Sequence, residues 1–69
     1  MDHQAPSLSR KSLFARVKKI LGSEEKAKYW FGTPNPLLGG TTPDRMIQIG
    51  RAAKLEQFIA NAEYENSPP

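Results

Sequence analysis

The sequence predicts an all-α fold, a small bundle of three to four helices, and three observations support this. Apolar residues recur at helical spacing in two long segments, 9–22 and 51–64. Serine or threonine stands at the expected start of three helices, and glycine stands near the expected ends. No alternating run of β-branched residues is long enough for a strand. Because a chain of 69 residues buries only a modest core, we expect a second copy or a partner to add stability.

We expect residues 1–8 to form a flexible tail, residues 9–65 a single helical domain and residues 66–69 a frayed end. The first helix is predicted to follow Ser9, whose hydroxyl accepts a hydrogen bond from a first-turn amide. Gly22 is predicted to end it, because glycine adopts the left-handed conformation of a C-terminal cap. The apolar residues of this helix fall within one arc and are Leu13, Phe14, Val17, Ile20 and Leu21.

A second, shorter helix is predicted from Ser23, its N-cap, to Gly32, which we expect to end it. Glu24 and Glu25 fall in its first turn, where the helix dipole favours acidic side chains. Its predicted apolar side consists of Ala27, Trp30 and Phe31.

The connector that follows, WFGTPNPLLGGTTPDRM, contains three of the six prolines and three of the five glycines. A residue before proline is biased toward extended conformations, and Gly39-Gly40 permits a sharp reversal. We expect Leu37 and Leu38 to pack beneath the loop, and Thr42 to cap a third helix. The predicted structural loop comprises Thr33, Pro34, Asn35, Pro36, Leu38, Gly39, Gly40 and Pro43.

The third helix is predicted from about Pro43 to Ile49 and the fourth from about Arg51 to Tyr64, with a break at Gly50. Apolar positions of the third helix are Met46, Ile47 and Ile49, and the core stripe of the fourth is Leu55, Phe58, Ile59 and Ala62.

The opposite face of the fourth helix carries small residues and one tyrosine at heptad-like spacing, which favours a homodimer contact. The alternative is that alanine is simply a good helix former. The predicted dimer face consists of Ala53, Gln57, Ala60 and Tyr64.

The net charge of +3 is distributed unevenly. Residues 1–28 carry seven Lys or Arg against three Asp or Glu, whereas residues 29–69 carry three against four. Between Arg10 and Lys19 there are five basic residues and no acidic one. Such a segment favours nucleic acid, an anionic membrane or an acidic protein surface, and the alternative is a solvated helix face.

Catalytic chemistry is not expected from this sequence. The chain has no cysteine, and its one histidine, His3, lies in the predicted tail. No phosphate-binding, metalloprotease or nucleophile motif occurs. We therefore expect a non-enzymatic protein without metal or cofactor. No apolar run approaches a membrane span and the start lacks a signal-peptide core, so we expect a cytoplasmic location.

Residues 28–66 resemble the C-terminal toxin-binding domain of the Xre/MbcA/ParS antitoxins. That pattern is a helix ending in an aromatic residue, a T-P-N-x-x-L-x-G-x-x-P loop, a short helix, a glycine and a longer amphipathic helix. The resemblance implies an all-helical, often dimeric module that inhibits a toxin by docking on it, with its C-terminal end, here Glu63–Pro69, directed at the toxin site. The DNA-binding domain that usually precedes it is not found in this sequence. The matching residues are Trp30, Thr33, Pro34, Asn35, Leu38, Gly40, Pro43, Gly50 and Leu55.

The chain also resembles, in length and architecture, a short phage-encoded anti-activator of quorum sensing. Three hypotheses follow from these resemblances and from the charge pattern. Our first hypothesis is therefore a dimeric inhibitor that blocks DNA binding by a LuxR-type transcription regulator. The second is an antitoxin against a RES-domain toxin that degrades NAD, and the third is nucleic-acid binding through the basic first helix, including Lys19. The predicted partner-binding residues are Arg10, Lys11, Arg16, Lys18, Glu56, Glu63 and Tyr64.

Overall fold

The computed structural model describes residues 8–65 and 68–69, and this part of the chain is mostly helical. It contains no β-strand, only an isolated bridge between Asn35 and Thr41, so the predicted all-α class is confirmed. Most of the predicted tail (1–7) and part of the predicted frayed end (66–67) lie outside the described residues. The elements are α1 (Arg10–Leu21), α2 (Glu24–Gly32), the 3-10 helix η1 (Pro36–Leu38), α3 (Pro43–Gln48) and α4 (Ala52–Glu65).

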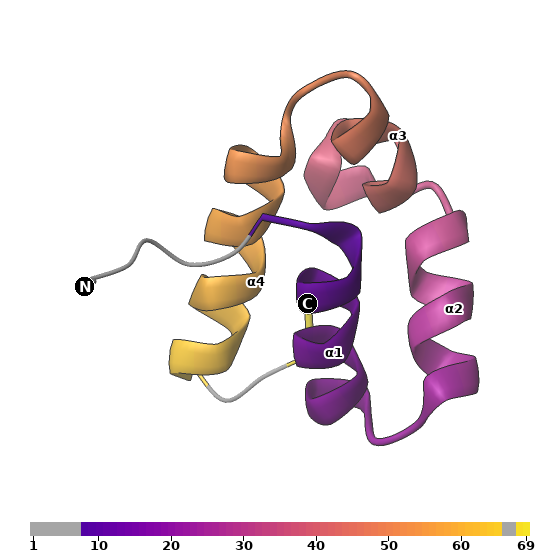
Figure 1. Ribbon diagram of the computed structural model, residues 1–69, viewed down its shortest axis with the longest axis vertical. Coiled ribbons are helices and arrows are strands. Elements are labelled where there is room, and N and C mark those ends of the chain that lie inside the picture. The colour runs from indigo at the N-terminus through magenta and orange to yellow at the C-terminus, as the bar shows by residue number, and fades with distance from the viewer. Residues whose placement is uncertain (1–7, 66–67) are drawn as a thin grey trace.

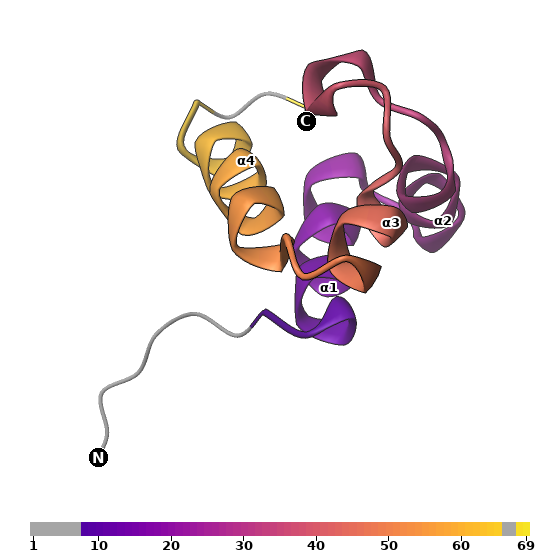
Figure 2. The same ribbon diagram turned by 90° about the horizontal axis from the view of Figure 1, so that it is seen from above.

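The helices form a compact arrangement in which α1 lies between α4 and α2 (Figure 1). α1 packs against both of these helices, and the short α3 packs against α2 and α4 at one end of the bundle. Viewed from above, η1 lies on the opposite side of the molecule from the start of α1 (Figure 2). A tight turn therefore connects α1 to α2, whereas the longer loop between α2 and α3 carries η1.

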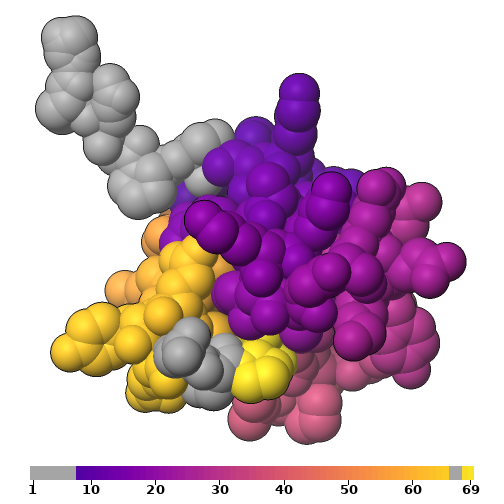
Figure 3. All heavy atoms as spheres, turned by 90° about the horizontal axis from the view of Figure 1, so that it is seen from below, coloured from indigo at the N-terminus to yellow at the C-terminus, as the bar shows by residue number. Residues whose placement is uncertain are grey.

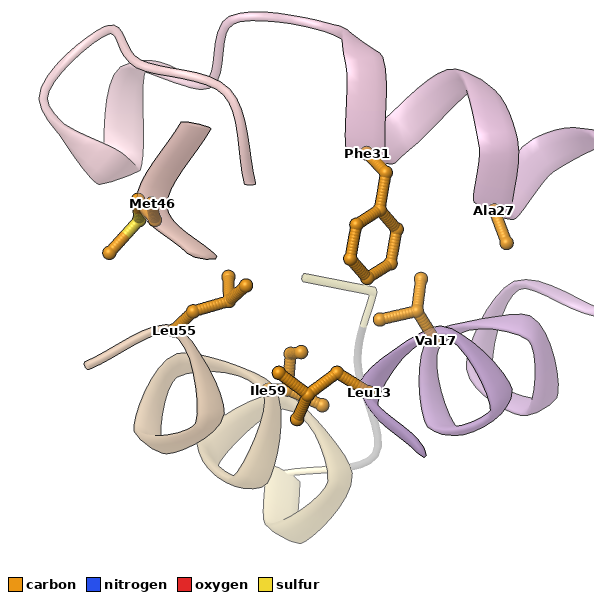
Figure 4. Close-up of a cluster of buried hydrophobic side chains, with 7 residues drawn as sticks. All are labelled: Leu13, Val17, Ala27, Phe31, Met46, Leu55 and Ile59. Carbon is orange, nitrogen blue, oxygen red and sulfur yellow. The ribbon is translucent and has the colours of Figure 1, made fainter. Parts of the chain in front are cut away.

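One hydrophobic core joins all four α-helices. The largest buried side chain is Phe31 of α2, whose ring points toward Val17 and Leu13 of α1 (Figure 4). Leu55 and Ile59 of α4 approach from the other side. Within the described residues, no polar or charged residue is buried. The core consists of Leu13, Val17, Ala27, Phe31, Met46, Leu55 and Ile59, with Ala62 also buried at its edge.

The helix starts are where capping chemistry predicts them. The side chains of Ser9, Ser23 and Thr42 accept hydrogen bonds from backbone amides three residues further on, at 3.2, 3.1 and 3.0 Å. Gly22 has a φ of 89° and donates its amide to the carbonyl of Lys18 at 2.7 Å, which ends α1 as predicted. These features are local, and so a sequence pattern is sufficient to find them.

Asn35 organises the connector. Its side-chain Oδ1 accepts from the amide of Leu37 at 2.9 Å and thereby caps η1. Its carbonyl accepts from the amides of Leu38 and Gly40, both at 2.9 Å, and its own amide donates to the carbonyl of Thr41 at 3.0 Å. One residue thus closes the loop with both its side chain and its backbone, which accounts for an asparagine at this point of the motif.

Several details differ from the sequence predictions. Gly32 ends α2 as predicted, but it does so as the last helical residue and without a left-handed conformation, and Thr33 is the C-cap. The 3-10 helix η1 was not predicted, and within it Leu37 is 73% exposed, so the prediction that Leu37 packs beneath the loop is wrong. Leu38 is half-buried and does pack against the core.

Two apolar positions in the last two helices also differ. Phe58, predicted in the core stripe of α4, is only half-buried, and Ile49, predicted as an apolar position of the third helix, is 50% exposed. Ile49 is the C-cap of α3, where the chain leaves the core for the turn at Gly50.

Candidate functional site

Arg16 connects α1 to α4 through two carboxylates. Its Nε and Nη2 donate to Oε2 and Oε1 of Glu63 at 2.9 and 2.6 Å, and its Nη1 donates to Oε2 of Glu56 at 3.0 Å. Glu56 and Glu63 lie two turns apart on one face of α4, which lets a single guanidinium reach both. We call these three residues the α1–α4 ion-pair cluster. All three were predicted to bind a partner; the structure gives them a contact within the chain, and a partner role stays a prediction.

The cluster shifts the pKa values of two of its members, Glu63 and Arg16. The hydrogen bond from Arg16 lowers the pKa of Glu63 below its ordinary value of 4.5, partial burial opposes this, and the charges of Arg16 and Lys19 lower the pKa further. The hydrogen bond to Glu63 in turn raises the pKa of Arg16, against partial desolvation and with help from Glu56. The ion pairs are therefore fully formed at neutral pH.

Arg10 is also engaged within the chain. Its Nε donates to Oδ1 of Asp44 in the first turn of α3 at 2.6 Å. Its guanidinium carbon lies 5.2 Å from the ring centroids of both Phe14 and Phe31, within the range of a cation–π contact. The pair with Asp44 is open to solvent, so we expect it to contribute little to stability.

The remaining basic residues of α1, Lys11, Lys18 and Lys19, are exposed. The side chains of α1 form the middle of the face shown in Figure 3, between those of α4 and α2. In the described part of the chain, Lys11 and Lys18 form no ion pair. Two of the five bases that suggested nucleic acid, Arg10 and Arg16, are thus neutralised by the fold, and a patch of three lysines is left.

A groove of about 350 Å³ lies between η1 and α4, and we call it the η1–α4 groove. Leu37 and the half-buried Phe58 supply apolar surface, and the ring of Phe58 stacks on Trp30 with centroids 6.3 Å apart. Arg51 and Lys54 bring positive charge, and no acidic residue lines the groove. The lining residues are Leu37, Leu38, Gly39, Met46, Arg51, Lys54, Gln57, Phe58 and Asn61.

Sequence reasoning missed this groove for a physical reason. It treated Leu37 and Leu38 as one apolar pair, whereas the 3-10 turn that begins at Pro36 directs neighbouring residues to different sides. The available signal was the Asn-Pro pair, because asparagine caps short helices and proline favours their first position.

The face of α4 predicted for self-association is accessible in the monomer. Ala53 and Gln57 are exposed, Ala60 is half-buried and Tyr64 is 91% exposed. This accessibility is compatible with a homodimer, which stays a prediction. Tyr64 and Tyr29, which is 75% exposed, are the two most exposed aromatic side chains among the described residues.

The described residues include no group of three or more His, Cys, Asp or Glu that could hold a metal ion. None of their helices is both long and apolar enough to cross a membrane. His3 lies outside the described residues.

Comparison with known proteins places this architecture in a family. The model of the antitoxin Xre/MbcA/ParS C-terminal toxin-binding domain matches residues 16–64, more than two thirds of the chain. No curated protein and no solved structure matches the chain. The family match begins at Arg16 within α1, earlier than the resemblance over residues 28–66, and so it includes the second half of α1, all of α2 and α3, and α4 up to Tyr64. The chain belongs to the family of the antitoxin Xre/MbcA/ParS C-terminal toxin-binding domains.

Proposed function

We propose that this protein is a non-enzymatic inhibitor of the antitoxin type, which binds a toxin protein and blocks it by docking. The observation that carries the proposal is the family match over residues 16–64. It extends from the middle of α1 to the last turn of α4, and so it includes the connector and every core residue except Leu13. The toxin class implied by the resemblance is the RES-domain toxin, which degrades NAD.

The exposed side chains suit a binding role. Leu37, Tyr29 and Tyr64 are large, apolar or aromatic, and each is exposed by more than two thirds. Such side chains contribute much of the free energy of protein–protein binding when a partner buries them. An inhibitor that blocks its target by occlusion needs no catalytic group of its own, and this chain has no cysteine nucleophile.

A LuxR-type regulator was the first hypothesis from the sequence, and it ranks second after the family match. It relied on acidic residues of α4 to contact a basic DNA-binding surface. Glu56 and Glu63 are paired with Arg16 within the chain, which reduces the negative charge available to such a partner. No comparison favours this regulator over a toxin.

The test is co-expression of the protein with a RES-domain toxin, with growth and cellular NAD as the measurements. We expect restored growth, preserved NAD and a complex that co-elutes in size-exclusion chromatography. Depleted NAD with no complex would contradict the proposal. Repression of a LuxR-regulated reporter in the same cells, without rescue from the toxin, would favour the second hypothesis instead.

A further inference from the structure

We infer that the η1–α4 groove is the docking site for a segment of the partner protein that carries an apolar side chain next to carboxylates. The inference rests on the proposed function in one respect, because it assumes a protein partner. Beyond the proposed function, the inference names the surface of this protein that binds the partner and the chemistry of the partner segment that occupies this surface.

The apolar part of the argument starts at Leu37. This side chain is 73% exposed. It belongs to η1, which is stabilised by Pro36, by the capping side chain of Asn35 and by the left-handed conformation of Gly39. Across the groove, Phe58 is half-buried and is held in place by stacking on Trp30. An exposed apolar side chain across from a partly open aromatic ring favours burial by an apolar group of a partner.

The charges of the groove determine which apolar segment fits. Arg51 and Lys54 line it, and in the part of the chain that the structure describes neither forms an ion pair. The arginines of α1 differ, because Arg10 and Arg16 both pair with carboxylates. With two unpaired cations and no acidic residue in the lining, the groove complements a segment with Asp or Glu.

The amides of the groove favour a peptide. Gln57 and Asn61 are exposed, lie one turn apart on α4 and face the groove, so each side chain can both donate to and accept from a peptide backbone. Nucleic acid fits less well. Leu37 offers no stacking surface, and Phe58 already uses one face of its ring on Trp30.

The test uses the intact chain, immobilised, to select from a displayed library of random short peptides. We expect the enriched peptides to contain Leu, Phe or Trp beside Asp or Glu. Recovery should fall at least about tenfold with Leu37→Ser or Lys54→Glu. The matched control is Lys26→Glu, which reverses an exposed lysine of α2 outside the groove lining and should retain recovery. Circular dichroism checks that each variant folds.

Three outcomes would overturn the inference: no enrichment, enriched peptides that lack acidic residues, or equal recovery by Lys54→Glu and Lys26→Glu. A single-stranded oligothymidine that shifts the amide resonances of Leu37 and Phe58 would also overturn it and assign the groove to nucleic acid. A lower mass for Leu37→Ser than for the unmodified protein in light scattering would assign the groove to a second copy.

The toxin assay separates this inference from the proposed function. If the unmodified protein rescues cells and the double variant Leu37→Ser/Lys54→Glu rescues equally well, the groove is not the docking site and the proposed function stands. If the unmodified protein fails to rescue while peptide selection succeeds, the proposed function fails and the groove remains a peptide site.

Discussion

The α1–α4 ion-pair cluster and the η1–α4 groove flank the buried stripe of α4 on its two sides, and they differ in how positive charge is balanced. At about 100° per residue, Glu56 and Glu63 fall on one side of Leu55 and Ile59, and Lys54 and Phe58 fall on the other. In the cluster, two carboxylates of α4 neutralise Arg16 of α1. In the groove, Arg51 and Lys54 lie beside exposed apolar surface, and no carboxylate lines it.

This difference separates residues that hold the fold from residues that are available to a partner. A cation that is hydrogen-bonded to carboxylates of its own chain has little charge left to offer another molecule. A cation without such a partner, next to an exposed leucine, gains both charge neutralisation and apolar burial when a complementary segment binds. Positive charge in the sequence therefore has two roles, and only the contacts distinguish them.

The largest expected effect comes from truncating a residue in the buried stripe of α4, which lies between the two regions. We expect Ile59→Ala to lower the free energy of unfolding by about 3 kcal/mol, because Ile59 is fully buried and its truncation leaves a cavity. That is a large part of the total stability of a small domain, so peptide and toxin binding should be weakened together. Urea denaturation measures the free energy of unfolding, and a loss below about 1 kcal/mol would show that the buried stripe is not essential.

Breaking the ion-pair cluster should have the next largest effect. We expect Arg16→Ala to lower the free energy of unfolding by about 2 kcal/mol, because it leaves Glu56 and Glu63 near one another without a cation. Solvent screens part of the repulsion between the two carboxylates. Lys18→Ala is the matched control on the outer side of α1 and should change stability by less than about 0.5 kcal/mol. Equal denaturation midpoints for the two variants would contradict a structural role for the cluster.

Acid should weaken the α1–α4 ion-pair cluster and thereby lower the stability of the fold. Because the folded-state pKa of Glu63 lies below its ordinary value of 4.5, its contribution is fully present above that pH and is lost as the pH falls through the folded-state pKa. The carboxylate is partly exposed, so the loss should be less than about 1 kcal/mol. Denaturation at a series of pH values should show a weaker pH dependence for Glu63→Gln, and identical pH profiles would argue against this pair.

The smallest effect on stability is expected in the groove. Lys54→Gln should change the free energy of unfolding by less than about 0.5 kcal/mol, since the side chain is exposed and pairs with no described carboxylate. Its effect should appear in peptide recovery instead. A midpoint lowered as much as that of Arg16→Ala would mean that Lys54 has a structural role and would remove the contrast between the two regions.

Much of the fold could be predicted from local patterns. The caps at Ser9, Ser23 and Thr42 involve an amide three residues away, and the stop at Gly22 needs only its own backbone freedom. Gly32 shows the limit of that rule, because a glycine near a helix end can also remain helical when the following residue provides the cap.

The candidate sites could be predicted only in part. Arg16, Glu56 and Glu63 were selected as charged residues, but their mutual pairing joins residues that are 40 and 47 positions apart, which no spacing rule reveals. Leu37 was assigned to the wrong side because the 3-10 turn, and not hydrophobicity, determines which of two adjacent leucines reaches the core. Lys11 and Lys18 stayed exposed as the sequence suggested.

By itself, the sequence determined the all-helical class, the positions of the helix starts and the family motif, because hydrophobic period, capping and loop chemistry act over a few residues. Only the tertiary structure decided which charges are neutralised and which apolar side chains stay exposed. Both depend on which helix faces pack together, and in this protein that packing pairs Arg16 with α4 and leaves Leu37, Arg51 and Lys54 around an open groove.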